Sequence, residues 1–179
     1  AHDPVSLVTY LSAVTEKLGF AVTMSTTFYP PFLLARTLAT LDHLTKGRIG
    51  WNIVSSHSPA EAQNFGMDDL PAHDERYDRA DEYMEACYAL WNCWEDDALV
   101  VDMEHKVYAD PAKVHRADFV GKWYKTRGPF TVIPSPRRRP FLFQAGQSER
   151  GKTFAARHAD GIFSAARGTK QMRAYCEDL

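Results

Sequence analysis

The pattern of apolar and polar positions along the chain changes repeatedly between a helical and a strand-like period. Stretches with apolar residues at every third or fourth position predict amphipathic helices. Short β-branched or apolar runs between them predict buried strands. The predicted elements, in chain order, are helix 4–18, strand 20–26, helix 31–47, strand 48–54, helices 58–64 and 74–92, strand 141–146, helix 149–158, strand 160–166 and a helix from Thr169.

Local signals support several of these boundaries. Asp3 and Pro4 combine an N-cap side chain with proline at the first helical position, and Gly19 ends the helix that they start. Lys46 and Gly47 close the second helix as a C-cap does. Strand 20–26 is apolar on both sides, as expected of a strand covered on both faces. The apolar stripes that predict buried helix faces are Leu7, Val8, Leu11, Val14 and Leu18 in the first helix and Leu33, Leu34, Leu38, Leu41 and Leu44 in the second.

The order of strands and helices predicts right-handed βαβ units and a parallel sheet. A doubly wound sheet and a (β/α)8 TIM barrel both fit that order. No G-x-G-x-x-G sequence follows any predicted strand, which favours the barrel. A complete barrel needs about 250 residues, whereas the chain has 179. We therefore expect residues 1–179 to form a single partial α/β barrel domain, with an insertion at 94–136 in which residues 121–130 form an extended pair of strands.

Composition and charge exclude some classes of function. The 21 basic and 23 acidic residues leave a formal charge of −2, and the one basic run, Arg137–Arg139, is expected to be a solvated loop. A nucleic-acid-binding surface is therefore not expected. No apolar run approaches the about 20 residues that cross a bilayer, so no membrane association is expected. The three cysteines lack metal-type spacing and are expected to be reduced thiols of a cytoplasmic protein.

Polar side chains gather where the predicted strands end, which is where both candidate architectures bind ligands. Each of these residues, taken alone, is explained better by capping a helix or satisfying a turn than by a ligand, and only the whole set favours a site. They are Thr23, Ser25, Thr26 and Thr27 after the first strand, Asn52, Ser55, Ser56 and His57 after the second, Gln144, Gly146, Gln147 and Ser148 after the third, and Ser164 and Arg167 after the fourth.

Two segments indicate what kind of ligand such a site would hold. In "QAGQSERG" a glycine, a serine and free backbone N–H groups stand at a helix N-terminus, an arrangement that receives phosphate. His73 and Tyr77 lie one helical turn apart and face the same way if their helix starts early enough. Otherwise His73 and Asp74 cap the helix and Tyr77 packs in the core. The acidic residues that follow are expected on a solvated face: Asp81, Glu82 and Glu85.

Other chemistries have little support in the sequence. No G-x-S-x-G nucleophile motif occurs, and neither Cys87 nor Cys93 has a histidine nearby in sequence. His57, His73 and Asp74 do not have the spacing of a metal site, and no metal is expected.

A resemblance to a known family covers essentially the whole chain. It rests on "LVTYLSAVTEKLGFAVTMSTTFYPPFLLARTLATLDHLTKGRIGWNIVSS", "NFG", "HDERYDRADEYMEACYALW", "WEDDALV", "DPAKVH" and "FQAGQSERGKTFAARHADGIF". These segments resemble the flavin-dependent monooxygenases of the bacterial luciferase-like superfamily. The branch concerned holds nitrilotriacetate, dibenzothiophene-sulfone and long-chain alkane monooxygenases.

The resemblance implies a (β/α)8 barrel that binds reduced FMN supplied by a separate NAD(P)H:flavin reductase. Such a protein lets O2 add to the flavin as a peroxide and oxidises an organic substrate in a dry pocket. The family's first strand is expected before Ala1, and its last barrel units, with the catalytic residues, after Leu179. An organosulfur substrate such as a sulfone is favoured, with an aminopolycarboxylate or an alkane as alternatives. A homo-oligomer is expected.

The resemblance also implies a role for individual residues. Thr23 matches a position beside the flavin ring, and Asn52 matches a contact to the ring or ribityl chain. The match places His73 and Tyr77 on the ribityl-phosphate side. The remaining expected contacts are Gly146 and Ser148 at the phosphate, and Ser56 and His57 beside the flavin. Two alternatives from other classes stay open, a non-catalytic flavin-binding barrel and a deazaflavin-dependent dehydrogenase.

Overall fold

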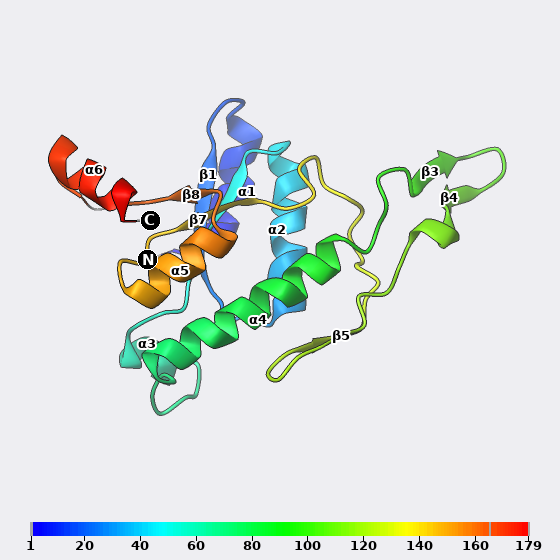
Figure 1. Cartoon of the computed structure of the whole chain (residues 1–179). Helices are drawn as coiled ribbons and strands as arrows, with labels where there is room; N and C mark the ends of the chain where they lie inside the picture. Colours follow the sequence, from blue (N-terminus) through cyan, green and yellow to red (C-terminus); the bar gives the residue numbers. More distant parts are fainter. Residues whose placement is uncertain (1, 165, 179) are drawn as a thin grey trace.

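The computed structural model describes residues 2–164 and 166–178, which form one four-stranded sheet, the helices packed on it, and two small hairpins (Figure 1). The elements are α1 (Pro4–Val14), β1 (Phe20–Ser25), α2 (Pro31–Thr45), β2 (Ile49–Val54), α3 (Pro59–Asn64), α4 (His73–Trp91), β3 (Leu99–Asp102), β4 (Val107–Ala109), the 3-10 helix η1 (Pro111–Lys113), β5 (Phe119–Val120), β6 (Lys125–Thr126), β7 (Phe141–Gln144), α5 (Glu149–His158), β8 (Gly161–Ile162) and α6 (Thr169–Glu177).

The main sheet is parallel, and its strand order is that of a barrel segment. The order β1-β2-β7-β8 follows the chain without a reversal. A doubly wound sheet reverses its strand order at a switch point, so this order confirms the expected barrel type. Within the described residues the sheet stays open. The last strand is shorter than the expected 160–166, and Ala165 of that range lies outside the described residues.

The helices pack on one side of the sheet and bury its apolar side chains. Val22 and Met24 of β1 and Trp51 and Ile53 of β2 face α2 and α4, and each is at most 3% exposed. The Trp51 Nε1–H donates to the Met24 carbonyl at 2.9 Å. On the other side of β1, Ala21 and Thr23 are exposed. The expectation that this strand is covered on both faces is therefore wrong, because the structure places helices on only one face.

The first two helices bury less of their apolar stripes than expected. In α1 only Val8 is buried, and Leu7, Tyr10 and Val14 are 46–69% exposed. The helix ends at Val14 and not at Leu18. In α2 the expected face is narrower, because Leu33 and Leu44 are each 49% exposed while Leu34, Leu38 and Leu41 are buried.

The insertion at 94–136 consists mainly of loops around two hairpins. The β3–β4 hairpin extends away from the rest of the molecule, whereas the β5–β6 hairpin lies beside α4 (Figure 1). A pair of strands is present as expected, but it does not span residues 121–130. Phe119 pairs with Thr126 and Val120 with Lys125, and residues 121–124 form the turn.

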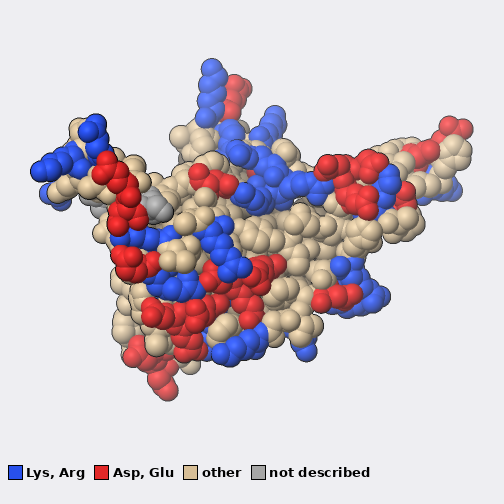
Figure 2. All heavy atoms as spheres, in the orientation of Figure 1, with Lys and Arg blue, Asp and Glu red and all other residues tan. Residues whose placement is uncertain are grey.

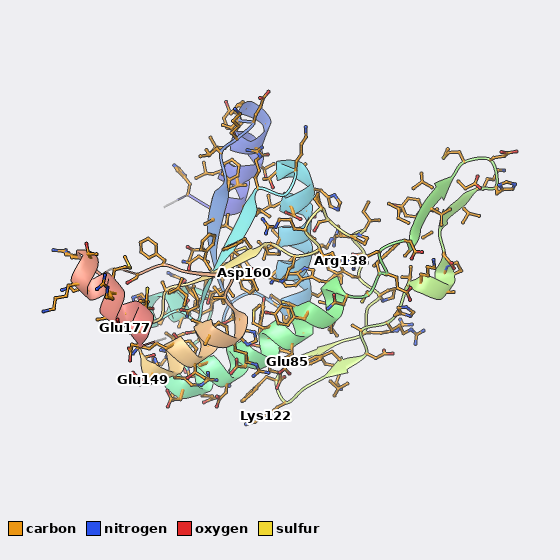
Figure 3. The ribbon with its side chains drawn as sticks, turned by 45° about the horizontal axis from the view of Figure 1, so that its top comes forward. Glu85, Lys122, Arg138, Glu149, Asp160 and Glu177 are labelled. Atoms are coloured by element: carbon orange, nitrogen blue, oxygen red, sulfur yellow. The ribbon has the colours of Figure 1, made fainter. Side chains whose placement is uncertain are left out.

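The basic run before β7 is a loop as expected, but it is not freely solvated. Arg138 Nε donates to Asp96 at 2.7 Å, and Arg138 Nη1 donates to the Trp94 carbonyl at the same distance. Arg139 Nη2 donates to Asp160 at 2.7 Å. Figure 3 marks Arg138 on the segment between the insertion and the sheet. These arginines therefore attach the insertion and β8 to the sheet.

The three cysteines are free thiols, with Cys87 and Cys93 buried and Cys176 exposed. Among the described residues, none of the helices has the length and apolar character that crossing a membrane requires.

Candidate functional site

A cleft of about 540 Å³ opens at the carboxyl ends of β1, β2 and β7, between the sheet and the first turns of α4. Six of the eight residues expected to bind a cofactor line it. Asn52 and Ser148 do not, but each contacts a lining residue. The lining residues are Thr23, Ile53, Val54, Ser55, Ser56, His57, Glu61, His73, Arg76, Tyr77, Gln144, Ala145 and Gly146.

Thr23 and Asn52 form a polar pair on the side of the sheet that the helices leave open. They are register partners in β1 and β2, and Asn52 Nδ2 donates to Thr23 Oγ1 at 3.1 Å. The Asn52 Oδ1 atom is buried and has no hydrogen-bond partner among the described residues. A buried acceptor without a partner is costly, so this atom is suited to accept a hydrogen bond from a ligand.

Ser56 and His57 occupy different environments in spite of being neighbours. Ser56 is buried, has a backbone φ of 61°, and donates from its hydroxyl to Ser25 Oγ at 2.9 Å. A positive φ is uncommon outside glycine and is found at functional turns. His57 is exposed at the rim of the cleft. The structure therefore brings both residues to the site, with Ser56 held in place and His57 solvated.

His73 and Tyr77 lie on the same face of α4, because that helix starts at His73 itself. Their ring centroids are 5.2 Å apart. The alternative in which His73 and Asp74 cap the helix is wrong, since the N-cap is Ala72 and no side chain caps it. Tyr77 is 8% exposed and packs on Phe154 with a centroid distance of 5.7 Å. It is thus both a packed residue and a wall of the cleft.

Gly146, in the turn between β7 and α5, and Gly151, in the first turn of α5, both lie against the Tyr77 hydroxyl. A Cβ atom at Gly146 or Gly151 would approach the Tyr77 oxygen to 2.8 Å. Ser148 is the N-cap of α5, and its Oγ accepts from the Gly151 N–H at 3.0 Å. The same Oγ lies 3.3 Å from His73 Nε2. Capping and site roles therefore coincide at Ser148.

The sequence analysis missed Arg76. Among the described residues that line the cleft, it is the one with a guanidinium or ammonium group. Its Nη1 donates to the Pro71 carbonyl at 2.6 Å, while its Nε is buried without a partner. The available signal was its spacing, because a residue three positions after His73 shares the helix face of His73. Arg76 is well suited to an anionic ligand.

Two carboxylates of α4 that were expected on a solvated face make tertiary contacts instead. Asp81 accepts from His158 Nε2 at 2.8 Å and pairs with Arg150 of α5. Glu82 accepts backbone N–H groups of Lys122, Trp123 and Tyr124 in the β5–β6 hairpin at 2.7–2.8 Å. Glu85 fits the expectation better, since it is 47% exposed and, among the described residues, pairs only with the half-exposed Arg157.

Comparison with known proteins identifies the family of this fold and site. The family model described as luciferase-like monooxygenase matches residues 1–179. A dibenzothiophene-sulfone monooxygenase from Rhodococcus erythropolis is 50% identical over 97% of this chain and 38% of its own length. The crystal structure of a long-chain alkane monooxygenase superposes with a TM-score of 0.95 at 47% identity, over 99% of this chain and 41% of that one.

A third relative is described with a flavin. The crystal structure of a riboflavin lyase with modified FMN and riboflavin matches with a TM-score of 0.91 at 44% identity, over 99% of this chain and 40% of that one. The chain thus spans about two-fifths of the length of the relatives it matches. With a family model that matches every residue and relatives near 50% identity, the chain belongs to the luciferase-like monooxygenase family.

Proposed function

We propose that the protein is the oxygenating component of a two-component, FMNH2-dependent monooxygenase. The observation that carries this proposal is the distribution of polar groups around the cleft. Arg76, His73 and the Ser148-capped N-terminus of α5 stand at one end. Thr23 and Asn52, with its unpartnered oxygen, stand on the sheet. An elongated molecule with a dianionic end and a polar ring edge matches that distribution.

FMN fits these residues by the chemistry of its two ends. Its phosphate would lie at the α5 N-terminus, where Ser148 and backbone N–H groups donate and the helix dipole favours negative charge. Arg76 and His73 would supply further donors to the phosphate. Thr23 and Asn52 would contact the polar edge of the ring, and Tyr77 and Gly146 would line the ribityl-phosphate side. Ser56 and His57 would lie at the open side of the cleft.

When bound, reduced FMN supplies the reaction with O2 that oxygenates an organic substrate. The residues of this chain hold the flavin and exclude water from one side of it. Trp51, Ile53 and Met24 form an apolar layer directly behind the polar rim. Such a layer lowers the local dielectric and keeps bulk solvent away from the cofactor. A separate NAD(P)H:flavin reductase would deliver the reduced cofactor.

An organosulfur compound is the substrate class we favour, because a dibenzothiophene-sulfone monooxygenase is 50% identical to this chain. An alkane is the first alternative, supported by the structural match to a long-chain alkane monooxygenase. An aminopolycarboxylate is a further alternative from the sequence. We also propose that residues 1–179 form one partial barrel domain of a cytoplasmic homo-oligomer.

Isotope labelling tests the reaction type. The protein is incubated with FMN, NADH, a flavin reductase, 18O2 and a panel of sulfones, sulfides, alkanes and aminopolycarboxylates. A monooxygenase places one 18O atom in the product. FMN binding without incorporation into any substrate would favour a non-catalytic flavin-binding barrel. Hydride transfer from a reduced deazaflavin without O2 consumption would favour the dehydrogenase alternative.

A binding measurement tests the site itself. The double variant Ser148→Ala/Tyr77→Phe removes two hydroxyl groups from the phosphate end. We expect FMN binding to weaken by about 1–3 kcal/mol, because hydrogen bonds to charged groups are lost. The matched control is Arg137→Gln, an exposed residue outside the cleft, which should leave FMN affinity unchanged. Wild-type affinity in the double variant would remove both residues from the site.

A further inference from the structure

Helices α4 and α5 are joined by a cluster of charged side chains that the proposed function does not use. Acidic residues of α4 and basic residues of α5 interleave where the two helices meet (Figure 2). Glu85 and Arg157 are about half-exposed, as surface ion pairs usually are. The side chains of Asp81, Arg150 and His158 are more buried, at 17%, 23% and 3% exposed.

Asp81 binds two groups of α5 at once. One carboxylate oxygen accepts from His158 Nε2 at 2.8 Å, and the other pairs with Arg150. Arg157 Nη1 lies 3.7 Å from the first oxygen. His158 is itself 3% exposed, and its Nδ1 lies 3.2 Å from the Tyr88 hydroxyl of α4. Burial alone would raise the pKa of Asp81, but the hydrogen bonds from His158 and Arg150 lower it below its usual value.

The two contacts of Asp81 hold opposite ends of α5. His158 is the last residue of that helix. Arg150 is the second residue after the N-cap Ser148, next to Gly151, whose N–H caps onto Ser148 Oγ. The Arg150 guanidinium also lies over the Tyr77 ring at 5.6 Å from its centroid. Asp81 is thus connected through one side chain to the turn that bears Ser148 and Gly146.

We infer that Asp81 is a positioning residue for the phosphate end of the site, acting through Arg150 to hold the N-terminus of α5 against His73 and Tyr77. The inference rests on the proposed function, because it concerns the same cofactor site. Its physical basis is that α5 contributes donors to the site only from its first turn. A small rotation of α5 would move Ser148 Oγ away from His73 Nε2, 3.3 Å distant, and the N–H groups away from a common ligand.

The test compares FMN with riboflavin, which is the same flavin without the phosphate. In Asp81→Asn we expect FMN affinity to fall by about tenfold, the size of one lost hydrogen bond to a charged group. Riboflavin affinity should change by less than about twofold, because riboflavin lacks the phosphate that the α5 N-terminus would bind. A residue with a merely structural role would weaken both flavins alike.

Two further variants make the test independent of folding defects. Arg150→Gln removes the same contact from the other helix and should reproduce the loss of preference for FMN. Glu85→Gln breaks only the half-exposed pair with Arg157, one turn further along α4, and should leave both affinities unchanged. Far-ultraviolet circular dichroism confirms folding, and if Asp81→Asn does not fold, Arg150→Gln decides the outcome.

The outcomes separate the inference from the proposed function. An equal loss for both flavins, or no change for either in Asp81→Asn and Arg150→Gln, would overturn the positioning role while FMN binding stands. A wild-type protein that binds neither flavin would overturn the proposed function and this inference with it.

Discussion

The two hairpins of the insertion differ in how they are attached to the body of the protein. The β5–β6 hairpin is bound by Glu82 of α4, whose carboxylate accepts three successive backbone N–H groups. Tyr124 adds a hydrogen bond from its hydroxyl to the Thr26 carbonyl at 3.3 Å and an edge-on contact to Tyr83. Figure 3 marks Lys122 at the turn of this hairpin, beside α4.

The β3–β4 hairpin has longer strands but fewer attachments. Its apolar side chains are exposed, from 37% for Leu99 to 84% for Met103. At its base Lys113 pairs with Asp97 and His115 pairs with Glu95, which joins the two ends of the hairpin to each other. Arg138 joins this base to the segment before β7 through Asp96. Strand length and apolar content would have predicted that the β3–β4 hairpin is the more firmly attached of the two. One carboxylate on a rigid helix therefore anchors a hairpin better than several apolar side chains without a surface to cover.

Removing the Glu82 carboxylate, the anchor of the β5–β6 hairpin, should lower the stability of the protein most. In Glu82→Ala three backbone donors lose their acceptor, and we expect the free energy of unfolding to fall by about 2–3 kcal/mol. Trypsin should cut much faster at Lys122 and Lys125, while sites in β3–β4 such as Lys106 should be cut at the wild-type rate. Unchanged cleavage at Lys122 would show that Glu82 does not hold the hairpin.

Crowding the anchor should have the next largest effect. A Cβ atom at Gly121 would lie 2.1 Å from Glu82 Oε1, so Gly121→Ala should displace the carboxylate and lower the free energy of unfolding by about 1–2 kcal/mol. The control is Gly19→Ala, whose added Cβ meets its nearest atom at 3.7 Å. If the mechanism is right, Gly121→Ala should cost little in the Glu82→Ala background. Full additivity of the two variants in urea denaturation would contradict it.

Acid should weaken one hairpin before the other parts of the fold. Burial alone would raise the pKa of Glu82, but the three backbone hydrogen bonds lower it from its usual 4.5. A lowered folded-state pKa means that this stabilisation is complete above pH 4.5 and is lost as pH falls through the folded pKa. Hydrogen-exchange protection of the Trp123 and Tyr124 amides should decline in that range. Glu82→Gln should lack this pH dependence, and an identical decline there would exclude Glu82 as its cause.

Polar substitution in the unanchored hairpin should have the smallest effect. Tyr108 is 58% exposed, so Tyr108→Ser should change the free energy of unfolding by less than about 0.5 kcal/mol. Thermal denaturation of the two proteins in parallel checks this value. A loss of 2 kcal/mol or more, far outside the range for surface positions, would mean that Tyr108 is covered in the protein in solution.

The sequence predicted features that depend on local signals along the chain, both at a helix end and in the site. Asp3 accepts from the Ser6 N–H at 3.1 Å, as its N-cap position predicts. Thr23 and Asn52 meet because residues at matching positions of adjacent parallel strands are register partners. His73 and Tyr77 meet because one helical turn separates them. In each case the controlling distance along the chain is a single turn or a single βαβ unit.

Contacts between distant segments were not predictable in this way. Asp81, Glu82 and Arg139 were all expected in solvent, yet each binds a distant segment. The partners of Asp81 are 69 and 77 residues away in the chain, those of Glu82 are 40 to 42 residues away, and that of Arg139 is 21 residues away. A charged residue on a helix shows the same local pattern whether water or another helix faces it. The exposure of Leu7 and Leu33 was missed for the same reason, since periodicity reports a face but not what covers it.

The amino-acid sequence thus determined the order of strands and helices and the polar character of the strand ends, because propensity, capping and periodicity act over a few residues. The tertiary structure decided which of those polar groups share a cleft, that Arg76 joins them, and that Asp81 and Glu82 bind α5 and the β5–β6 hairpin. Those outcomes depend on how helices pack on the sheet, and packing brings together residues whose separation along the chain carries no signal of their contact.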